Sequence, residues 1–205
     1  MRKLTEAEEF LLRNWSDVEK LQATVADLNA RLVSDVETAL TKRTWWARNQ
    51  FAAKPYVGKS GGALYVYKSN WLRGKWSWNT MEVSLVADGL DPGTLLGLEE
   101  YPLLFYVRVT KLAGSSSQFN QAFKKLSGYT PRKWASLGLE DFESDDDEYP
   151  IYFEANRSRE QWATSLKTGR YAEEICRYFD KLVQFISPID RVLAELRGSA
   201  ARKKR

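Results

Sequence analysis

Hydrophobic positions near the N-terminus recur at steps of three and four residues, which is the spacing of one face of an α-helix. The stripe runs from Leu11 to Val36, and the first forty residues contain no proline or glycine. Thr5 and Glu8 have the spacing of a capping box, which starts a helix. We therefore predict one long amphipathic helix over residues 1–42. The stripe can pack against the rest of the domain or pair two copies of the chain, and the pattern leaves both alternatives open.

Four later runs are rich in aromatic and β-branched residues, as is typical of β-strands. They cover residues 63–68, 75–87, 103–110 and 151–154. Short helices are predicted between the third and fourth runs. Because these runs follow one another without regular β-α-β alternation, they favour a small antiparallel sheet of about four strands in the region 63–155.

Helical spacing returns in the C-terminal part of the chain, over residues 157–197. Ser158 and Gln161 form a second capping-box pair, and Pro188 interrupts the last apolar stripe. Proline at that position either kinks a helix or starts a new one. Residues 198–205 end in RKKR, and we expect them to form a basic disordered tail.

Together these patterns predict an α+β fold in which the sheet packs with long N- and C-terminal amphipathic helices. The sequence shows no internal repeat and no low-complexity linker. We therefore expect a single domain over residues 1–197.

The residue inventory excludes several kinds of chemistry. The chain of 205 residues has no histidine and one cysteine, Cys176. Ser-His-Asp and Cys-His catalytic sites are excluded because no imidazole base is present, and zinc sites lack their usual ligands. No cofactor is predicted. The lone cysteine, the lack of a signal-peptide pattern and the absence of a run of roughly 20 apolar residues indicate a cytoplasmic protein with no membrane partner.

Positive charge and tryptophan are concentrated in one stretch of the chain. Residues 38–81 contain eight Lys and Arg, no Asp or Glu, and five of the eight tryptophans. Cations neutralise phosphates and flat rings stack on unpaired bases, so this composition is typical of a single-stranded nucleic-acid interface. The same aromatic residues can instead belong to the core. The candidate interface comprises Arg43, Trp45, Trp46, Arg48, Lys54, Lys59, Lys68, Trp71, Arg73, Lys75, Trp76 and Trp78.

Three functional hypotheses follow from these features. The first is a non-enzymatic binding or regulatory protein whose partner is a nucleic acid. The second is a protein-interaction module, an inhibitor or accessory subunit, that docks through the aromatic residues or through the acidic segment 140–154, which has eight carboxylates and no Lys or Arg.

The third hypothesis is a metal-dependent nuclease, because that chemistry requires only carboxylates and a lysine. Two candidate groups approach the required pattern of an upstream aspartate, an acidic residue and a lysine. Asp91 with Lys111 lacks the acidic residue, and Asp147 with Glu154 lacks the lysine. Residues 53–60 match a relaxed phosphate-loop pattern. The surrounding sequence predicts neither the strand before the loop nor the helix after it, so nucleotide binding is disfavoured.

Overall fold

The computed structural model describes residues 5–58, 61–98, 101–110, 116–128, 130–139 and 149–203. Five antiparallel strands pair in the order of the sequence. They are β1 (Phe51–Gly58), β2 (Gly61–Lys68), β3 (Val83–Asp88), β4 (Leu104–Val109) and β5 (Ile151–Glu154). The predicted α+β class is confirmed, and the sheet has five strands rather than about four.

The additional strand is β1. It was not predicted because it contains Pro55, and proline is unusual in a β-strand. β1 lies at the edge of the sheet, where a residue without an N–H is tolerated. The predicted run 75–87 is only partly a strand, because β3 begins at Val83. Its first half belongs to a loop that follows a short 3₁₀ turn, η1 (Ser69–Trp71), so Trp76 and Trp78 do not lie on a strand.

The helices lie at both ends of the chain and between the strands. They are α1 (Glu6–Arg13), α2 (Trp15–Thr41), α3 (Thr44–Arg48), α4 (Pro92–Leu95), α5 (Ser116–Ser127), α6 (Pro131–Ser136), α7 (Arg159–Lys167), α8 (Tyr171–Val183) and α9 (Ile186–Lys203). The predicted long N-terminal helix is divided at Asn14. Pro188 lies in the first turn of α9, so it marks a new helix. α9 continues to Lys203 and therefore includes residues 198–203, which we expected to lie in a disordered tail.

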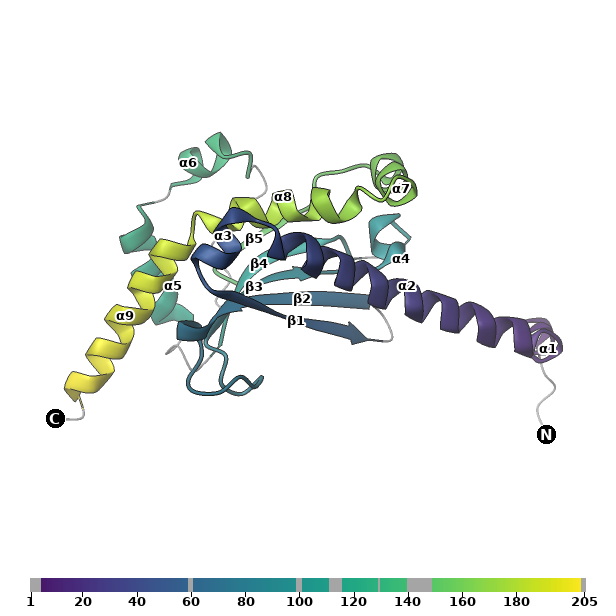
Figure 1. Cartoon of the computed structure of the whole chain (residues 1–205), viewed down its shortest axis with the longest axis horizontal. Coiled ribbons are helices and arrows are strands. Elements are labelled where there is room, and N and C mark those ends of the chain that lie inside the picture. Colours follow the sequence, from purple (N-terminus) through teal and green to yellow (C-terminus); the bar gives the residue numbers. More distant parts are fainter. Residues whose placement is uncertain are drawn as a thin grey trace.

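One face of the sheet is covered by α2, α3 and α8, whereas the loop between β2 and β3 lies on the opposite side (Figure 1). Alternate strand residues such as Leu64, Leu85 and Phe105 join side chains of α2 and α8, including Val36 and Phe179, in one hydrophobic core. α1 and the first half of α2 extend past the end of the sheet (Figure 1). Among the described residues, no helix is long and apolar enough to cross a membrane.

The close approach of α2 to the sheet depends on a glycine. A Cβ atom at Gly62 of β2 would lie 2.6 Å from Cγ2 of Val33 and 2.9 Å from the carbonyl oxygen of Leu90. Only a residue without a side chain fits at this distance. Gly62 therefore allows α2 to pack directly on β2.

Candidate functional site

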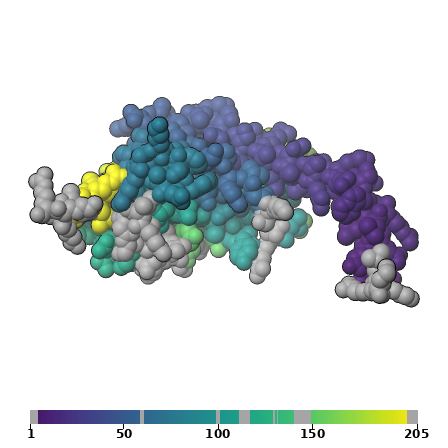
Figure 2. Space-filling model, turned by 90° about the horizontal axis from the view of Figure 1, so that it is seen from below, coloured from purple at the N-terminus to yellow at the C-terminus, as the bar shows by residue number. Residues whose placement is uncertain are grey.

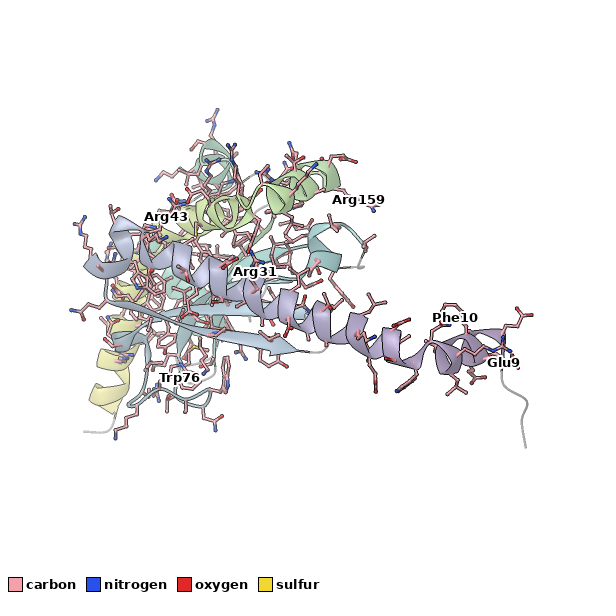
Figure 3. The ribbon with its side chains drawn as sticks, turned by 45° about the vertical axis from the view of Figure 1, so that its right-hand side comes forward. Glu9, Phe10, Arg31, Arg43, Trp76 and Arg159 are labelled. Atoms are coloured by element: carbon pink, nitrogen blue, oxygen red, sulfur yellow. The ribbon has the colours of Figure 1, made fainter. Side chains whose placement is uncertain are left out.

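The predicted interface residues do not form one continuous surface. Arg43 lies with the helices on one side of the sheet, whereas Trp76 lies on the other side (Figure 3). Trp45, Trp46 and Arg48 belong to α3 and are therefore grouped with Arg43. Lys59 lies outside the described residues. The sheet thus divides the predicted interface into two separate groups.

Trp71 belongs to the core, so its assignment to a binding surface is wrong. Its side chain is fully buried, and its ring meets that of Phe51 edge to face at 5.7 Å. The indole Nε1 donates a hydrogen bond of 2.7 Å to Oδ1 of Asp190. Trp45 and Trp46 are half-buried and also pack around Phe51, at ring distances of 5.3 Å and 6.0 Å.

Several predicted cations are already neutralised by carboxylates from the C-terminal helices. Arg43 forms ion pairs with Glu173 at 2.9 Å and Asp180 at 3.4 Å. Burial disfavours its charged form, but these carboxylates outweigh burial and raise the pKa of Arg43. Lys68 forms an ion pair of 2.5 Å with Asp190. The charges of Arg43 and Lys68 are therefore compensated by residues more than a hundred positions away.

Arg73 is paired in a similar way. Its Nε lies 2.5 Å from the carboxylate of Glu82, which is fully buried and also accepts a hydrogen bond from Arg197. A buried carboxylate requires such partners because charge is costly to remove from water. Arg73 therefore stabilises the base of the loop between β2 and β3.

A second group of rings forms what we call the aromatic face, which comprises Tyr65, Tyr67, Trp76 and Trp78. Strand alternation places the two tyrosines on the face opposite Leu64 and Val66. Tyr65 is half-buried, and Tyr67 is buried and belongs to the core cluster. Trp78 meets Tyr65 edge to face at 4.8 Å, Trp76 lies 6.4 Å from Tyr67, and the two indoles are 5.5 Å apart. Trp78 remains 41% exposed.

The two tryptophans are held by a hydrogen-bonded loop over residues 72–82. An isolated bridge joins Leu72 to Met81 at its base. Within it, Thr80 Oγ1 donates to the carbonyl of Lys75 at 2.8 Å and accepts from the Ser77 amide at 2.9 Å. Seen from below, this loop lies at the surface of the molecule (Figure 2). The loop therefore presents its side chains in a defined position.

Cations lie over the rings of the aromatic face. Lys54 Nζ is 5.1 Å from the ring centroid of Trp76, and the guanidinium of Arg108 is 5.8 Å from that of Tyr65. Both distances fit cation–π contacts. Lys54 and Lys75 are exposed to solvent. This side of the sheet therefore combines positive charge with aromatic surface.

Tyr65 and Arg108 were not among the residues predicted for the interface. The sequence offered one indication for Arg108. It is two positions after Tyr106 in the apolar run 103–110, and residues two apart on a strand share one face of the sheet. Burial raises the pKa of Tyr65, although Arg108 opposes this shift, so the phenol is neutral at physiological pH. A neutral ring can stack or donate a hydrogen bond.

Tyr106 anchors the centre of the same sheet face. It is buried, its hydroxyl donates to Oδ2 of Asp88 at 3.1 Å, and its ring meets Tyr149 at 4.7 Å. Burial, reinforced by the nearby Asp88 carboxylate, raises the pKa of Tyr106 far above its usual value. Tyr106 therefore supports the rings around it.

The features considered for nuclease or nucleotide chemistry are arranged differently. Asp91 caps α4, accepting from the amide of Thr94 at 2.9 Å and from its hydroxyl at 2.8 Å. In the described part of the chain, no group of three potential metal ligands converges. Lys111 and Asp147 lie outside it. Residues 53–58 belong to β1, and β2 follows at Gly61 where a phosphate loop would lead into a helix.

No protein-family model, curated protein or solved structure matched this chain. Its function must therefore be inferred from its own geometry and charge.

Proposed function

We propose that the protein binds single-stranded nucleic acid through the aromatic face. The exposed indole of Trp78 is the observation that carries this proposal, because its partner Tyr65 contacts it edge to face and leaves ring surface in water. Stacking of a base on such a ring contributes about 1–3 kcal/mol. A duplex keeps its bases stacked on each other, so single strands are the preferred ligand.

Charge on the same side supports an anionic ligand. Lys54, Lys75 and Arg108 lie on or beside the aromatic face, and no ion pair involves them within the described chain. Three phosphate contacts on a single strand predict a slope of about −2 for log K against log salt. This modest value reflects how many of the other cations are already paired.

The proposal is tested by fluorescence anisotropy with labelled oligonucleotides between about 50 and 200 mM salt, with tryptophan quenching recorded alongside. Trp78→Ala should weaken binding of single strands by about tenfold, within the range expected for one stacked base. Trp15→Ala is the matched control, because Trp15 is 53% exposed but lies on the N-terminal helix pair. Lys54→Ala should reduce the salt slope by about 0.7.

Two results would overturn the proposal. One is the absence of binding at low salt. The other is an equal loss of affinity in Trp78→Ala and Trp15→Ala, which would show that the aromatic face has no special role.

The alternative function, a protein-interaction module, predicts binding that changes little with salt. The acidic part of its docking surface, residues 140–148, lies outside the described residues. A separate apolar surface favours a protein partner and leads to the inference below.

A further inference from the structure

The N-terminal arm, which we define as residues 5–28, carries an apolar surface that no other described part of the chain covers. No residue of α1 is buried. The arm extends beyond the sheet (Figure 1). Its large apolar side chains are between 39% and 65% exposed: Phe10, Leu11, Leu12, Trp15, Leu21, Val25 and Leu28. Large apolar side chains exposed together on one part of a molecule often mark an interaction site.

A groove lies where the arm joins the domain. It has a volume of about 610 Å³ and is lined by α2 residues including Val18, Leu21 and Val25, and by Gly58 at the tip of the β1–β2 hairpin. Val57 beside it is 45% exposed. The groove is therefore large enough for several apolar side chains.

The groove also contains an unsatisfied amide. Asn29 is only 6% exposed and lines the groove, and its Oδ1 atom has no hydrogen-bond partner. Buried polar atoms are normally hydrogen-bonded, so this oxygen indicates a missing donor. Buried asparagines in helical stripes often fix the register of paired helices.

We propose that a second copy of this chain occupies the groove, so that two arms pair around a two-fold axis. The exposed fractions of the seven side chains correspond to roughly 700 Å² of surface, taking roughly 200 Å² for each fully exposed side chain. A stable interface covers about 800 Å² on each partner. Pairing provides this area when α1 packs together with the first half of α2, and two-fold closure prevents further growth. This inference is independent of the proposed nucleic-acid binding.

Charge favours an antiparallel arrangement of the two arms. The arm contains six carboxylates and two cations, a net charge of −4, with Glu6, Glu8 and Glu9 in the first turn. Parallel arms would bring these two acidic turns together. Antiparallel arms place these two acidic turns at opposite ends of the pair.

The stripe from Trp15 to Leu28 has its midpoint between Leu21 and Gln22. An antiparallel pair centred there places Val18 against Val25 of the other copy. It also brings Asn14 of the other copy toward Asn29. The Asn14 amide donates one N–H to the carbonyl of Phe10 at 2.8 Å, and its second N–H can serve the unsatisfied oxygen. Gln22 then lies next to its own counterpart at the axis.

Sedimentation velocity over a range of micromolar concentrations tests the pairing. The wild-type chain should form a dimer whose fraction increases with salt, because salt screens the repulsion between two arms of charge −4. The double variant Leu21→Glu, Val25→Glu should be monomeric with an unchanged circular dichroism spectrum, because both side chains are exposed. Ala30→Glu is the control, since Ala30 is exposed on the opposite side of α2 and its variant should still dimerise.

A wild-type chain that stays monomeric at all concentrations and salts would overturn the proposal and leave the groove to a different partner. A dimer that persists in the double variant would also overturn it. Nucleic-acid binding, measured on the same variants, should be unaffected. Failure of one proposal is thereby distinguished from failure of the other.

Cysteine cross-linking tests the orientation. Cys176 is buried, so a cysteine introduced on the arm is the reactive thiol. Gln22→Cys should oxidise readily to a covalent dimer, because the two residues meet at the axis. Val25→Cys should not form a covalent dimer. The two introduced cysteines would lie about 10 Å apart along the helix axis, the length of seven helical residues, which is too far for a disulfide. Efficient cross-linking of Val25→Cys alone would rule out the antiparallel arrangement.

Discussion

At the scale of single residues, two tryptophans of the same acid-free stretch have different roles. Trp71 is fully buried, where it packs on Phe51 and donates to Asp190. Trp78 is 41% exposed at the surface of the aromatic face. Seven positions along the chain therefore separate a structural tryptophan from a candidate ligand-binding one.

The Trp71→Ala substitution should lower the free energy of unfolding by about 3–5 kcal/mol, because it leaves a large cavity in the core. Trp78→Ala should lower it by less than about 1 kcal/mol, as expected for a partly exposed side chain. Urea unfolding followed by circular dichroism measures both. Similar losses in the two variants would contradict the assignment of Trp71 to the core and Trp78 to the surface.

At the scale of elements, the two halves of α2 are used differently. The second half contributes Leu32, Val33, Val36 and Leu40 to the core. The first half belongs to the arm. The apolar stripe continues along both halves of α2, but the sheet covers only the second half. The same helix therefore contributes side chains to the core and to an exposed surface.

Because α2 packs closely on the sheet, the stability of the protein should depend strongly on the absence of a side chain at Gly62. Gly62→Ala should destabilise the protein by about 1–3 kcal/mol, because the new methyl group overlaps with Val33 and with the backbone of Leu90. Val33→Ala should partly relieve this overlap, and a double-mutant cycle in urea measures the relief.

Gly198→Ala is the control. Apart from its own helix, no described atom lies within 4 Å of the new methyl group, so the change should be neutral or stabilising by about 0.5–1 kcal/mol. An equal effect of the two glycine substitutions would contradict this account of α2 packing.

At the scale of the whole molecule, buried phenols and a thiol connect folding to alkaline pH. Burial raises the pKa of the Cys176 thiol to about 12. It is also the main cause of the raised pKa of Tyr65, Tyr67, Tyr106, Tyr171 and Tyr178. These groups keep their protons in the folded protein at pH values where the unfolded chain loses them.

The stabilisation from these groups is therefore complete below their unfolded pKa values, about 8.5 for cysteine and about 10 for tyrosine, and it is lost as pH rises further. The urea midpoint should fall between about pH 8.5 and 11 at constant salt. Tyr106→Phe should make this decline shallower, because phenylalanine does not titrate. A midpoint that stays constant over this range would contradict the prediction.

Features that depend on neighbours along the chain could be predicted from the sequence alone. Helix starts at Thr5 and Ser158 were predicted from capping-box spacing, and both capping boxes are formed. Three of the predicted strand runs coincide with β2, β4 and β5 to within two residues at each end. Periodicity and capping involve contacts over three or four residues, so the sequence displays them directly.

The tertiary structure alone decided which side chains are available for binding. Arg43 and Lys68 were correctly placed in a basic stretch, but carboxylates of α8 and α9 neutralise them. β1 became a strand because β2 pairs with it, despite Pro55. The ion pairs of Arg43 and Lys68 join residues more than a hundred positions apart, and the exposure of the arm depends on where the sheet ends (Figure 1). A pattern read along one chain contains no information on those distances, so the aromatic face and the unpartnered arm emerged only from the fold.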